Sequence, residues 1–279
     1  MLRLKKKINR ELLLGTFVLG FYLIWAMLWA IYKNFIVGTW YQPYTPEMNF
    51  ALELSKPFQN NLILGADVLG RSMFELLSSG LTYSLTMAMI VTFITATTGI
   101  IFGYLSVKSH LIVRRFFDLV INIIFIFPSI LIAIMVMAVT GQSLTGLVFA
   151  MSITGWTGYA KIARGESKRI LNLSFVESAK AIGMGEFKLF YSVILPNLLP
   201  IMIVNMVLGI SGVIVSEAAL GFLGLGGSPY SWGALLSGAK TVLLEAPHVA
   251  IVLSLAMAGL IIGLNLFGDG LRDYLDPKN

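Results

Sequence analysis

Six long apolar stretches alternate with polar stretches along the chain, and this alternation predicts a bundle of helices that crosses a membrane. Each apolar stretch is long enough to cross about 30 Å of hydrocarbon, because an α-helix rises about 1.5 Å per residue. We expect spans at residues 12–31, 83–105, 117–140, 144–162, 198–222 and 249–267. The predicted fold class is therefore an all-α membrane protein with about six transmembrane helices.

Composition supports the membrane assignment and excludes several classes of function. Of the 279 residues, 57% are hydrophobic and only 12% are charged, whereas a soluble domain carries about 25% charged residues. The net charge of +6 does not indicate nucleic-acid binding, because the basic residues are spread over several loops. The chain has no cysteine, and its two histidines, His110 and His248, are far apart in sequence. We therefore expect no metal site and no cofactor.

The first apolar stretch follows the basic run at residues 5–7 and resembles a signal peptide at first sight. It is longer than the 7–15 residues of a signal-peptide core, and no small-residue cleavage site follows it. We therefore expect an uncleaved first span. Residues 1–80 would form an amino-terminal tail, this span and an external loop, and residues 81–279 would form a core of five helices.

Lysine and arginine residues orient the bundle, since short cytoplasmic loops are enriched in them. With the amino terminus inside, sixteen basic residues face the inside and four face the outside. The outer four are Lys33, Lys56, Arg71 and Lys240. Both termini and the loop at residues 164–197 are thus predicted to be cytoplasmic, and residues 33–80 and 225–247 external.

The loop at residues 164–197 has the features of a rigid helical hairpin. Ser174 and Glu177 have the spacing of a capping box, which would start a short amphipathic helix. Gly183 and Gly185 would end that helix, because glycine adopts left-handed backbone conformations at little cost. A second helix would then run to Pro196. A hairpin of this kind between membrane spans would fit into a groove of another protein.

The same loop resembles the EAA loop of ABC-importer permeases. The resemblance rests on Glu177-Ser178-Ala179, on Gly183 six residues after the glutamate, and on Leu195-Pro196. Ser178 stands where the family has alanine, and Val193 where it has isoleucine. By this resemblance, these residues would couple the chain to a cytoplasmic ATPase.

Other segments resemble the permeases of dipeptide, oligopeptide and nickel importers. Residues 64–71, with Gly65, Asp67, Gly70 and Arg71, are similar to the external LGTDxLGRD segment of that branch and would form a gate or external element. Further matches lie at residues 220–226, 231–233 and 266–273. The proline-glycine pair that usually precedes the last span is replaced by residues 247–250.

The resemblance implies a type I importer permease fold with a cytoplasmic coupling helix, in a bacterial inner membrane. The chain would form half of a translocation pathway beside a homologous second permease. Its other partners would be two cytoplasmic ATPase subunits and an external substrate-binding protein. ATP hydrolysis would belong to the ATPases, and this chain would contribute no catalytic residue. Residues 233–241 only approach a P-loop, because Ala239 interrupts the Gly-Lys pair.

Three residues inside the spans are candidates for the pathway or for packing. Pro128 should kink the third span, because proline removes a backbone hydrogen bond. Asn205 and Glu217 lie in the fifth span. A carboxylate at that depth needs a partner or water, so Glu217 is either a buried functional group or an interfacial residue that reaches the headgroups.

Two further alternatives concern mechanism and cargo. A secondary transporter would be expected to carry inverted repeats and ionisable residues at mid-span, and neither is evident. A membrane enzyme would need a cluster of catalytic side chains, which the sequence does not suggest. For the cargo, the sequence favours short peptides over a nickel chelate, because it offers no ligand cluster for a bare metal. A chelated metal would need no such ligands, so nickel remains open.

Overall fold

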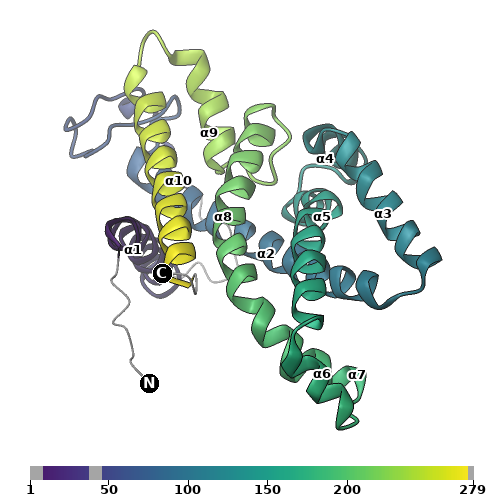
Figure 1. The fold of residues 1–279 in the computed structure, drawn as a ribbon. Helices are drawn as coiled ribbons and strands as arrows, with labels where there is room; N and C mark the ends of the chain where they lie inside the picture. Colours follow the sequence, from purple (N-terminus) through teal and green to yellow (C-terminus); the bar gives the residue numbers. More distant parts are fainter. Residues whose placement is uncertain (1–8, 38–45, 276–279) are drawn as a thin grey trace.

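The computed structural model describes residues 9–37 and 46–275, which are almost entirely helical (Figure 1). The basic run at residues 5–7, Pro43 and Lys278 lie outside these ranges. The helices in chain order are α1 (Arg10–Ile31) with a π-helical end (Tyr32–Ile36), a 3-10 turn (Phe50–Leu52), α2 (Met73–Lys108), α3 (Leu111–Ile126), α4 (Ser129–Thr140), α5 (Leu144–Leu171), α6 (Ser174–Ala181), α7 (Glu186–Leu189), the π-helix η3 (Phe190–Ile194), α8 (Leu195–Phe222), α9 (Trp232–Ala239), the 3-10 turn η4 (Lys240–Val242) and α10 (Pro247–Leu275). The all-α prediction is confirmed.

Fewer helices have the length and apolar composition of a membrane span than the six that we expected. In the described part of the chain, four helices are long and apolar enough to cross a membrane, or five if the bent pair α3–α4 counts as one. The remaining predicted span forms α5, which is rich in glycine and threonine and carries charges in its second half. Because α5 packs against α2, α4 and α8, it need not be apolar on every face. Its role as a span remains a prediction.

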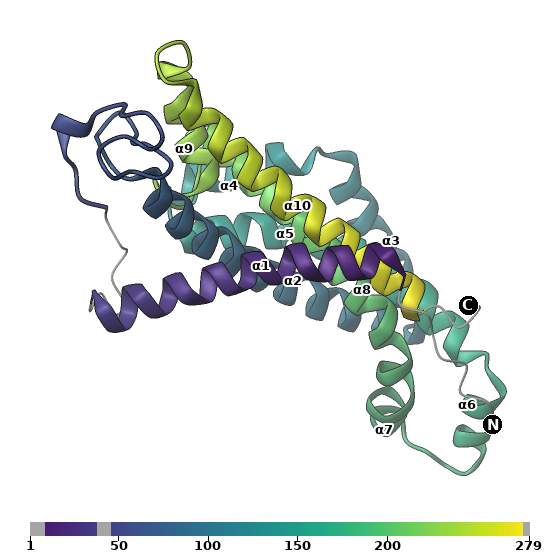
Figure 2. The same ribbon diagram turned by 90° about the vertical axis from the view of Figure 1, so that its left-hand side faces the viewer.

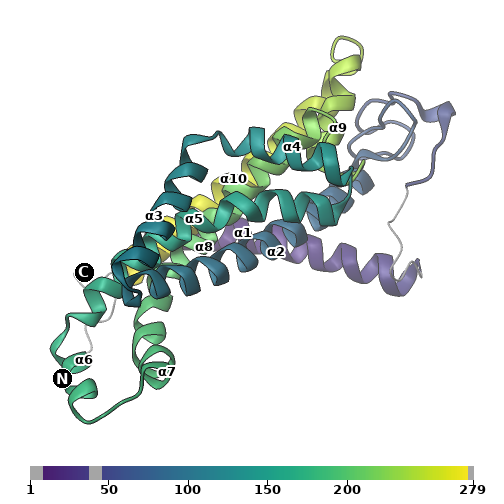
Figure 3. The ribbon, with the colours of Figure 1, turned by 90° about the vertical axis from the view of Figure 1, so that its right-hand side faces the viewer.

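Two pairs of helices and one shared helix make up the bundle. Helix α2 runs along α5, α1 runs along α10, and α8 contacts both pairs (Figures 2 and 3). Two GxxxG pairs, Gly99 with Gly103 on α2 and Gly259 with Gly263 on α10, allow these helices to pack closely. A Cβ at Gly103 would lie 2.7 Å from the carbonyl oxygen of Ala160 on α5, and one at Gly263 would lie 2.7 Å from a methyl of Val18 on α1. These glycines are therefore required by the close approach of the helices.

The third predicted span is broken, not merely kinked. Helices α3 and α4 meet at an angle of 88°. Phe127 has an extended backbone, with φ of −85° and ψ of 133°, as the residue before a proline prefers. Pro128 then forms the N-cap of α4. A proline whose predecessor leaves the helical conformation ends one helix and allows a second to start in a new direction.

The second span also begins earlier than its hydropathy indicated. We expected it at residue 83, whereas α2 begins at Met73 and runs through residue 80. Its first turns are buried by the folded segment at residues 46–72 and by α9, so they do not need the hydrophobicity of a lipid-facing helix. The irregular segment before α2 therefore ends at residue 72 and not at residue 80.

The two ends of the bundle differ in structure. Helices α6 and α7 project from one end, and the irregular segment at residues 46–72 lies at the other (Figure 2). The start of α1 and the end of α10 lie together, where the side-chain nitrogen of Asn9 donates to Asp273 Oδ2 over 3.1 Å. Figure 2 places this pair of helix ends on the side of the bundle that carries α6 and α7.

Candidate functional site

A helix–glycine–helix hairpin lies at the end of the bundle that carries α6 and α7. Helix α6 ends in a left-handed Gly183, with φ of +81°. The Gly183 amide donates to the Lys180 carbonyl over 2.9 Å, and the Met184 amide donates to the Ala179 carbonyl over 3.1 Å. This pair of bonds is a Schellman motif. The predicted role of Gly183 as a helix stop is confirmed, whereas Gly185 has φ of −65° and instead precedes α7.

The predicted capping box at Ser174 and Glu177 is wrong. The N-cap of α6 is Leu173, and Ser174 already lies inside the helix. Only two residues separate α5 from α6, and the amide of Leu173 donates to the carbonyl of Ile170 over 3.0 Å. This tight connection brings the apolar side chain of Leu173 to the N-cap. Glu177 is exposed in the first helical turn, and Ser178 Oγ donates to the Ser174 carbonyl over 3.1 Å.

We expected the second helix of the hairpin to end at Pro196, and this prediction is wrong. Helix α7 passes through the π-helical turn η3 directly into α8, which begins at Leu195. Within that turn the Leu195 amide donates to the Phe190 carbonyl, five residues earlier. Pro196, which has no amide hydrogen to donate, directly follows this π-helical turn and lies in the first turn of α8. The hairpin is therefore rigidly continuous with a membrane helix.

One face of the hairpin packs on the bundle and the other is exposed. Val176, Leu189 and Ile194 are fully buried in an apolar cluster with residues of α2, α5 and α8. In contrast, Ile182 is 81% exposed and Phe187 is 77% exposed. Large apolar side chains that project into solvent beyond a membrane bundle indicate a surface for another protein.

A polar contact that we did not predict joins the hairpin to α2. Lys108 Nζ donates to Glu186 Oε1 over 2.6 Å, and the Tyr104 hydroxyl donates to Glu186 Oε2 over 3.4 Å. The Tyr104 ring also lies against Phe190, with 4.6 Å between centroids. Lys108 and Glu186 are 78 residues apart, so no local sequence pattern could indicate this contact.

Side chains of α5 form polar contacts with α3, which has few other contacts with the bundle. Arg164 forms an ion pair with Asp118, and its second nitrogen donates to Asp118 Oδ2 over 3.2 Å. Lys161 Nζ lies 3.5 Å from the centroid of the Phe125 ring. Cation–π contacts of this kind are favourable where water is scarce. These contacts give α3 a defined position relative to α5.

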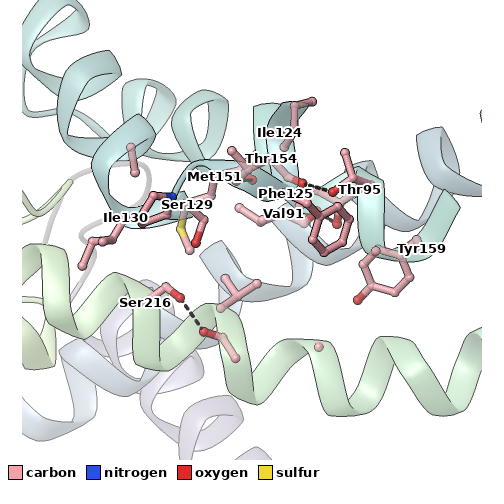
Figure 4. A pocket seen from close by; sticks show the side chains of 18 of the residues that line it. Val91, Thr95, Ile124, Phe125, Ser129, Ile130, Met151, Thr154, Tyr159 and Ser216 are labelled. Atoms are coloured by element: carbon pink, nitrogen blue, oxygen red, sulfur yellow. Dashed lines mark hydrogen bonds between the residues drawn. The ribbon is translucent and has the colours of Figure 1, made fainter. Parts of the chain in front are cut away.

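A cavity of about 760 Å³ opens between α2, the α3–α4 pair, α5 and α8. Figure 4 shows Ser216 of α8 across this cavity from Ser129, Met151 and Thr154. Within the described ranges, no residue that lines it is Asp, Glu, Lys, Arg or His. Its polar side chains are Thr95, Ser129, Thr154, Thr157, Tyr159, Asn205 and Ser216. A cavity of this volume can hold a small organic molecule.

The three candidate residues of the spans fall into two groups. Pro128 and Asn205 both line the cavity, although they come from distant parts of the sequence. Glu217 lies elsewhere and is fully buried, and the Ser84 hydroxyl donates to its Oε2 over 3.2 Å. Its Oε1 has no hydrogen-bond partner among the described residues. The alternative of an interfacial glutamate that reaches the headgroups is therefore wrong.

The irregular segment at residues 46–72 is organised around Asp67, which is 6% exposed. Its carboxylate accepts from the amides of Leu69 and Arg71 over 3.0 and 2.9 Å, and from Arg71 Nε and Nη2 over 2.8 and 2.5 Å. Gly65 and Gly70 both have left-handed backbones. A Cβ at Gly70 would collide with the Asn49 carbonyl, so this turn requires glycine. The structure thus brings together Gly65, Asp67, Gly70 and Arg71, as their closeness in sequence suggested.

Comparisons with known proteins identify relatives of the whole chain. The family model described as "Binding-protein-dependent transport system inner membrane component" matches residues 95–279. The glutathione transport system permease protein GsiD of Pectobacterium atrosepticum is 34% identical over 271 residues, which cover 95% of this chain and 85% of that protein. GsiD of Salmonella typhimurium is 34% identical over 270 residues, with coverage of 96% and 86%.

Among solved structures, a chain of the MetNI methionine ABC transporter in inward-facing conformations is similar in fold. The TM-score is 0.59 at 18% sequence identity, and the match covers 73% of this chain and 98% of that chain. The shared fold extends over most of the described helices.

Proposed function

Because this chain belongs to the family of binding-protein-dependent transport system inner membrane components, we propose that it forms half of a peptide-conducting passage. The chain is a permease subunit of an ABC importer and has the type I importer permease fold. Such an importer includes an ATPase and a substrate-binding protein. In our proposal, a homologous second permease completes the passage, and two ATPase subunits bind at the cytoplasmic end.

The hairpin of α6 and α7 is the proposed contact with an ATPase subunit. Its exposed side chains Ile182 and Phe187 would enter a groove of that subunit. The residues of the coupling motif, Glu177, Ser178, Ala179 and Gly183 with Leu195 and Pro196, form the hairpin and its junction with α8. Because the hairpin is packed on α2, α5 and α8, a displacement of α6 would move the cytoplasmic ends of these helices together.

The cavity between α2 and α8 is the observation on which the proposed passage depends. It combines a volume suited to a small molecule with a lining that is mainly apolar and carries several uncharged polar side chains among the described residues. A strongly charged lining would retain an oppositely charged cargo, and a purely apolar lining would exclude a hydrated one. The external segment at residues 46–72 would lie at the outer entrance, where Arg71 stacks on Tyr230 with 5.7 Å to the ring centroid.

Short peptides are the cargo that we propose. The relatives from Pectobacterium and Salmonella are named as glutathione permeases, and glutathione is a tripeptide. The hydroxyl and amide groups of the cavity suit the amide groups of such a cargo. Nickel carried as an organic chelate is the alternative, because a chelate would need no metal ligands from the passage.

Uptake by cells that lack this gene tests the proposal. Labelled glutathione, di- to pentapeptides and radioactive nickel would be offered in parallel, with and without the gene restored on a plasmid. We expect peptide uptake to fall in the deletion strain and to return on complementation, with nickel uptake unchanged. Loss of nickel uptake with normal peptide uptake would refute the peptide cargo and leave the family assignment intact.

A further inference from the structure

Four glycines line the cavity, and they differ in what surrounds them. Gly155 and Gly158 lie on α5, and Gly209 and Gly212 lie on α8. A Cβ at Gly155 would lie 2.9 Å from a methyl of Thr95, and one at Gly209 would collide with the Tyr159 hydroxyl. These two glycines are therefore required by the packing of the helices.

Gly158 and Gly212 have no such packing role. Across the described part of the chain, no heavy atom beyond the local helix would lie within 4 Å of a Cβ at either position. Glycine in a helix interior is less favourable than alanine. Helices α5 and α8 thus bear this cost at two positions where a side chain would fit the fold. What a side chain would occupy there is the open space of the cavity.

The chemistry of the lining makes the size of this space important. Ser216 Oγ donates to the Gly212 carbonyl over 2.9 Å, Thr95 Oγ1 to the Val91 carbonyl over 2.7 Å, and Asn205 Nδ2 to the Ile201 carbonyl over 2.7 Å. Because these three donors are engaged within their own helices, their oxygen lone pairs and the second N–H of Asn205 are left for a cargo. Uncharged acceptors of this kind can bind any N–H group, and they distinguish one peptide from another only weakly.

We propose that Gly158 and Gly212 set the width of the passage and thereby limit the size of the side chains that a transported peptide can carry. This inference rests on the proposed function, because it assumes that the cavity is part of the passage for peptides. Cargo selection at the permease is then steric. Bulkier residues at positions 158 and 212 narrow the passage without disturbing the helix packing.

Replacement of the two glycines by larger residues tests this inference. Gly158→Leu and Gly212→Leu, with Gly158→Ala and Gly212→Ala as smaller steps, would be expressed in cells that lack the gene. Uptake of labelled trialanine and triphenylalanine would be measured, together with the amount of the chain in the membrane. Gly20→Leu is the matched control, since Gly20 is equally open but lies on α1, away from the cavity.

The expected result is a change in selectivity. Each leucine variant should lower triphenylalanine uptake about tenfold or more relative to trialanine uptake. The reason is that the bulky peptide would be overpacked against the new leucine, and overpacking usually destabilises a complex by at least the free energy of a tenfold change. The alanine variants should change the same ratio less and in the same direction. They also serve as the test if a leucine variant does not reach the membrane. Gly20→Leu should leave the ratio unchanged.

Two outcomes would overturn the inference. Unchanged triphenylalanine uptake in both leucine variants, or an equal fall for both peptides, would show that these glycines do not set a size limit. In either case the proposed peptide passage would still stand, because the wild-type chain carries the probes. If the wild-type chain carried no peptide at all, the proposed function would fail, and this inference would fail with it.

Discussion

Replacement of Gly183 by valine isolates the backbone conformation of the hairpin from its side-chain contacts. Gly183 has φ of +81°, and in the described ranges nothing beyond its chain neighbours would lie within 4 Å of an added Cβ. The valine side chain of Gly183→Val therefore causes no clash with the rest of the described chain, and the effect of the substitution comes from the backbone. A left-handed backbone costs an L-residue about 1–2 kcal/mol, and a β-branched side chain is among the least tolerant.

The magnitude follows from the two ways in which the hairpin can respond. Valine can remain left-handed and bear the strain of about 1–2 kcal/mol. Alternatively, it can leave that conformation and break the two Schellman hydrogen bonds to Ala179 and Lys180, each worth about 0.5–1.5 kcal/mol net. Either response costs about 1–3 kcal/mol and lowers the population of the ordered hairpin about 5- to 150-fold relative to disordered states.

The assay is the amount of cargo transported per ATP hydrolysed by the purified complex in proteoliposomes. We expect Gly183→Val to lower this ratio about fivefold or more, with normal amounts of the chain in the membrane, because the damage lies outside the spans. Gly183→Asn should retain most of the coupling, since asparagine tolerates the left-handed conformation. Gly185→Val is the matched control, with an equally open site but φ of −65°. A wild-type ratio in Gly183→Val, or an equal loss in Gly185→Val, would refute the reasoning.

Three further predictions concern the contact between the hairpin and α2, the external segment and the topology. Glu186→Lys should lower the transport-to-ATP ratio about two- to fivefold, as expected for loss of a partly exposed ion pair. The double variant that also carries Lys108→Glu should restore the ratio. If it does not, the ion pair does not contribute to coupling. Asp67→Asn removes a buried charge that accepts hydrogen bonds worth about 1.5–3 kcal/mol each. The segment at residues 46–72 should therefore unfold more often in this variant, and trypsin should cleave it at Lys56 faster. An unchanged cleavage rate would contradict the role of Asp67. The chain has no cysteine, so a thiol reagent would label only the cysteine of an Asn61→Cys variant. If residue 61 is external, a membrane-impermeant thiol reagent added from outside should label this variant. Labelling only from inside would reverse the predicted topology.

Local sequence determined the features that could be predicted correctly. The apolar stretches identified the helices, and the position of Gly183 identified the end of α6, because both depend on residues that are close together in the chain. The turn around Asp67 was also predictable as a unit, since Asp67 accepts hydrogen bonds from residues two and four positions later. These are interactions whose partners are visible in one short window of sequence.

The wrong predictions arose where tertiary structure overrides a local pattern. Ser174 and Glu177 have the spacing of a capping box, but the two-residue connection from α5 makes Leu173 the N-cap. Pro196 follows a π-helical turn, and the helix continues through it into α8. In each case the sequence signal was real, and the packing of the hairpin against α2, α5 and α8 decided the outcome.

The cavity could not be predicted, because its lining combines four consecutive helices, α2 to α5, with the distant helix α8. Asn205 and Pro128 were candidates on their own, but nothing in the sequence indicated that they share one space. The same is true of Lys108 and Glu186. Glycines at positions 158 and 212 were indistinguishable from packing glycines until their surroundings were known.

Energised uptake by the complex that contains this chain is the most direct test of our account. The complex would be purified from membranes through a tag on this chain and reconstituted with its substrate-binding protein into vesicles, and uptake of labelled glutathione would be measured. We expect uptake only when ATP can be hydrolysed on the side of the vesicle that carries α6 and α7, and no uptake with a non-hydrolysable analogue. Uptake that proceeds without an ATPase subunit, driven by a proton or sodium gradient alone, would contradict the account.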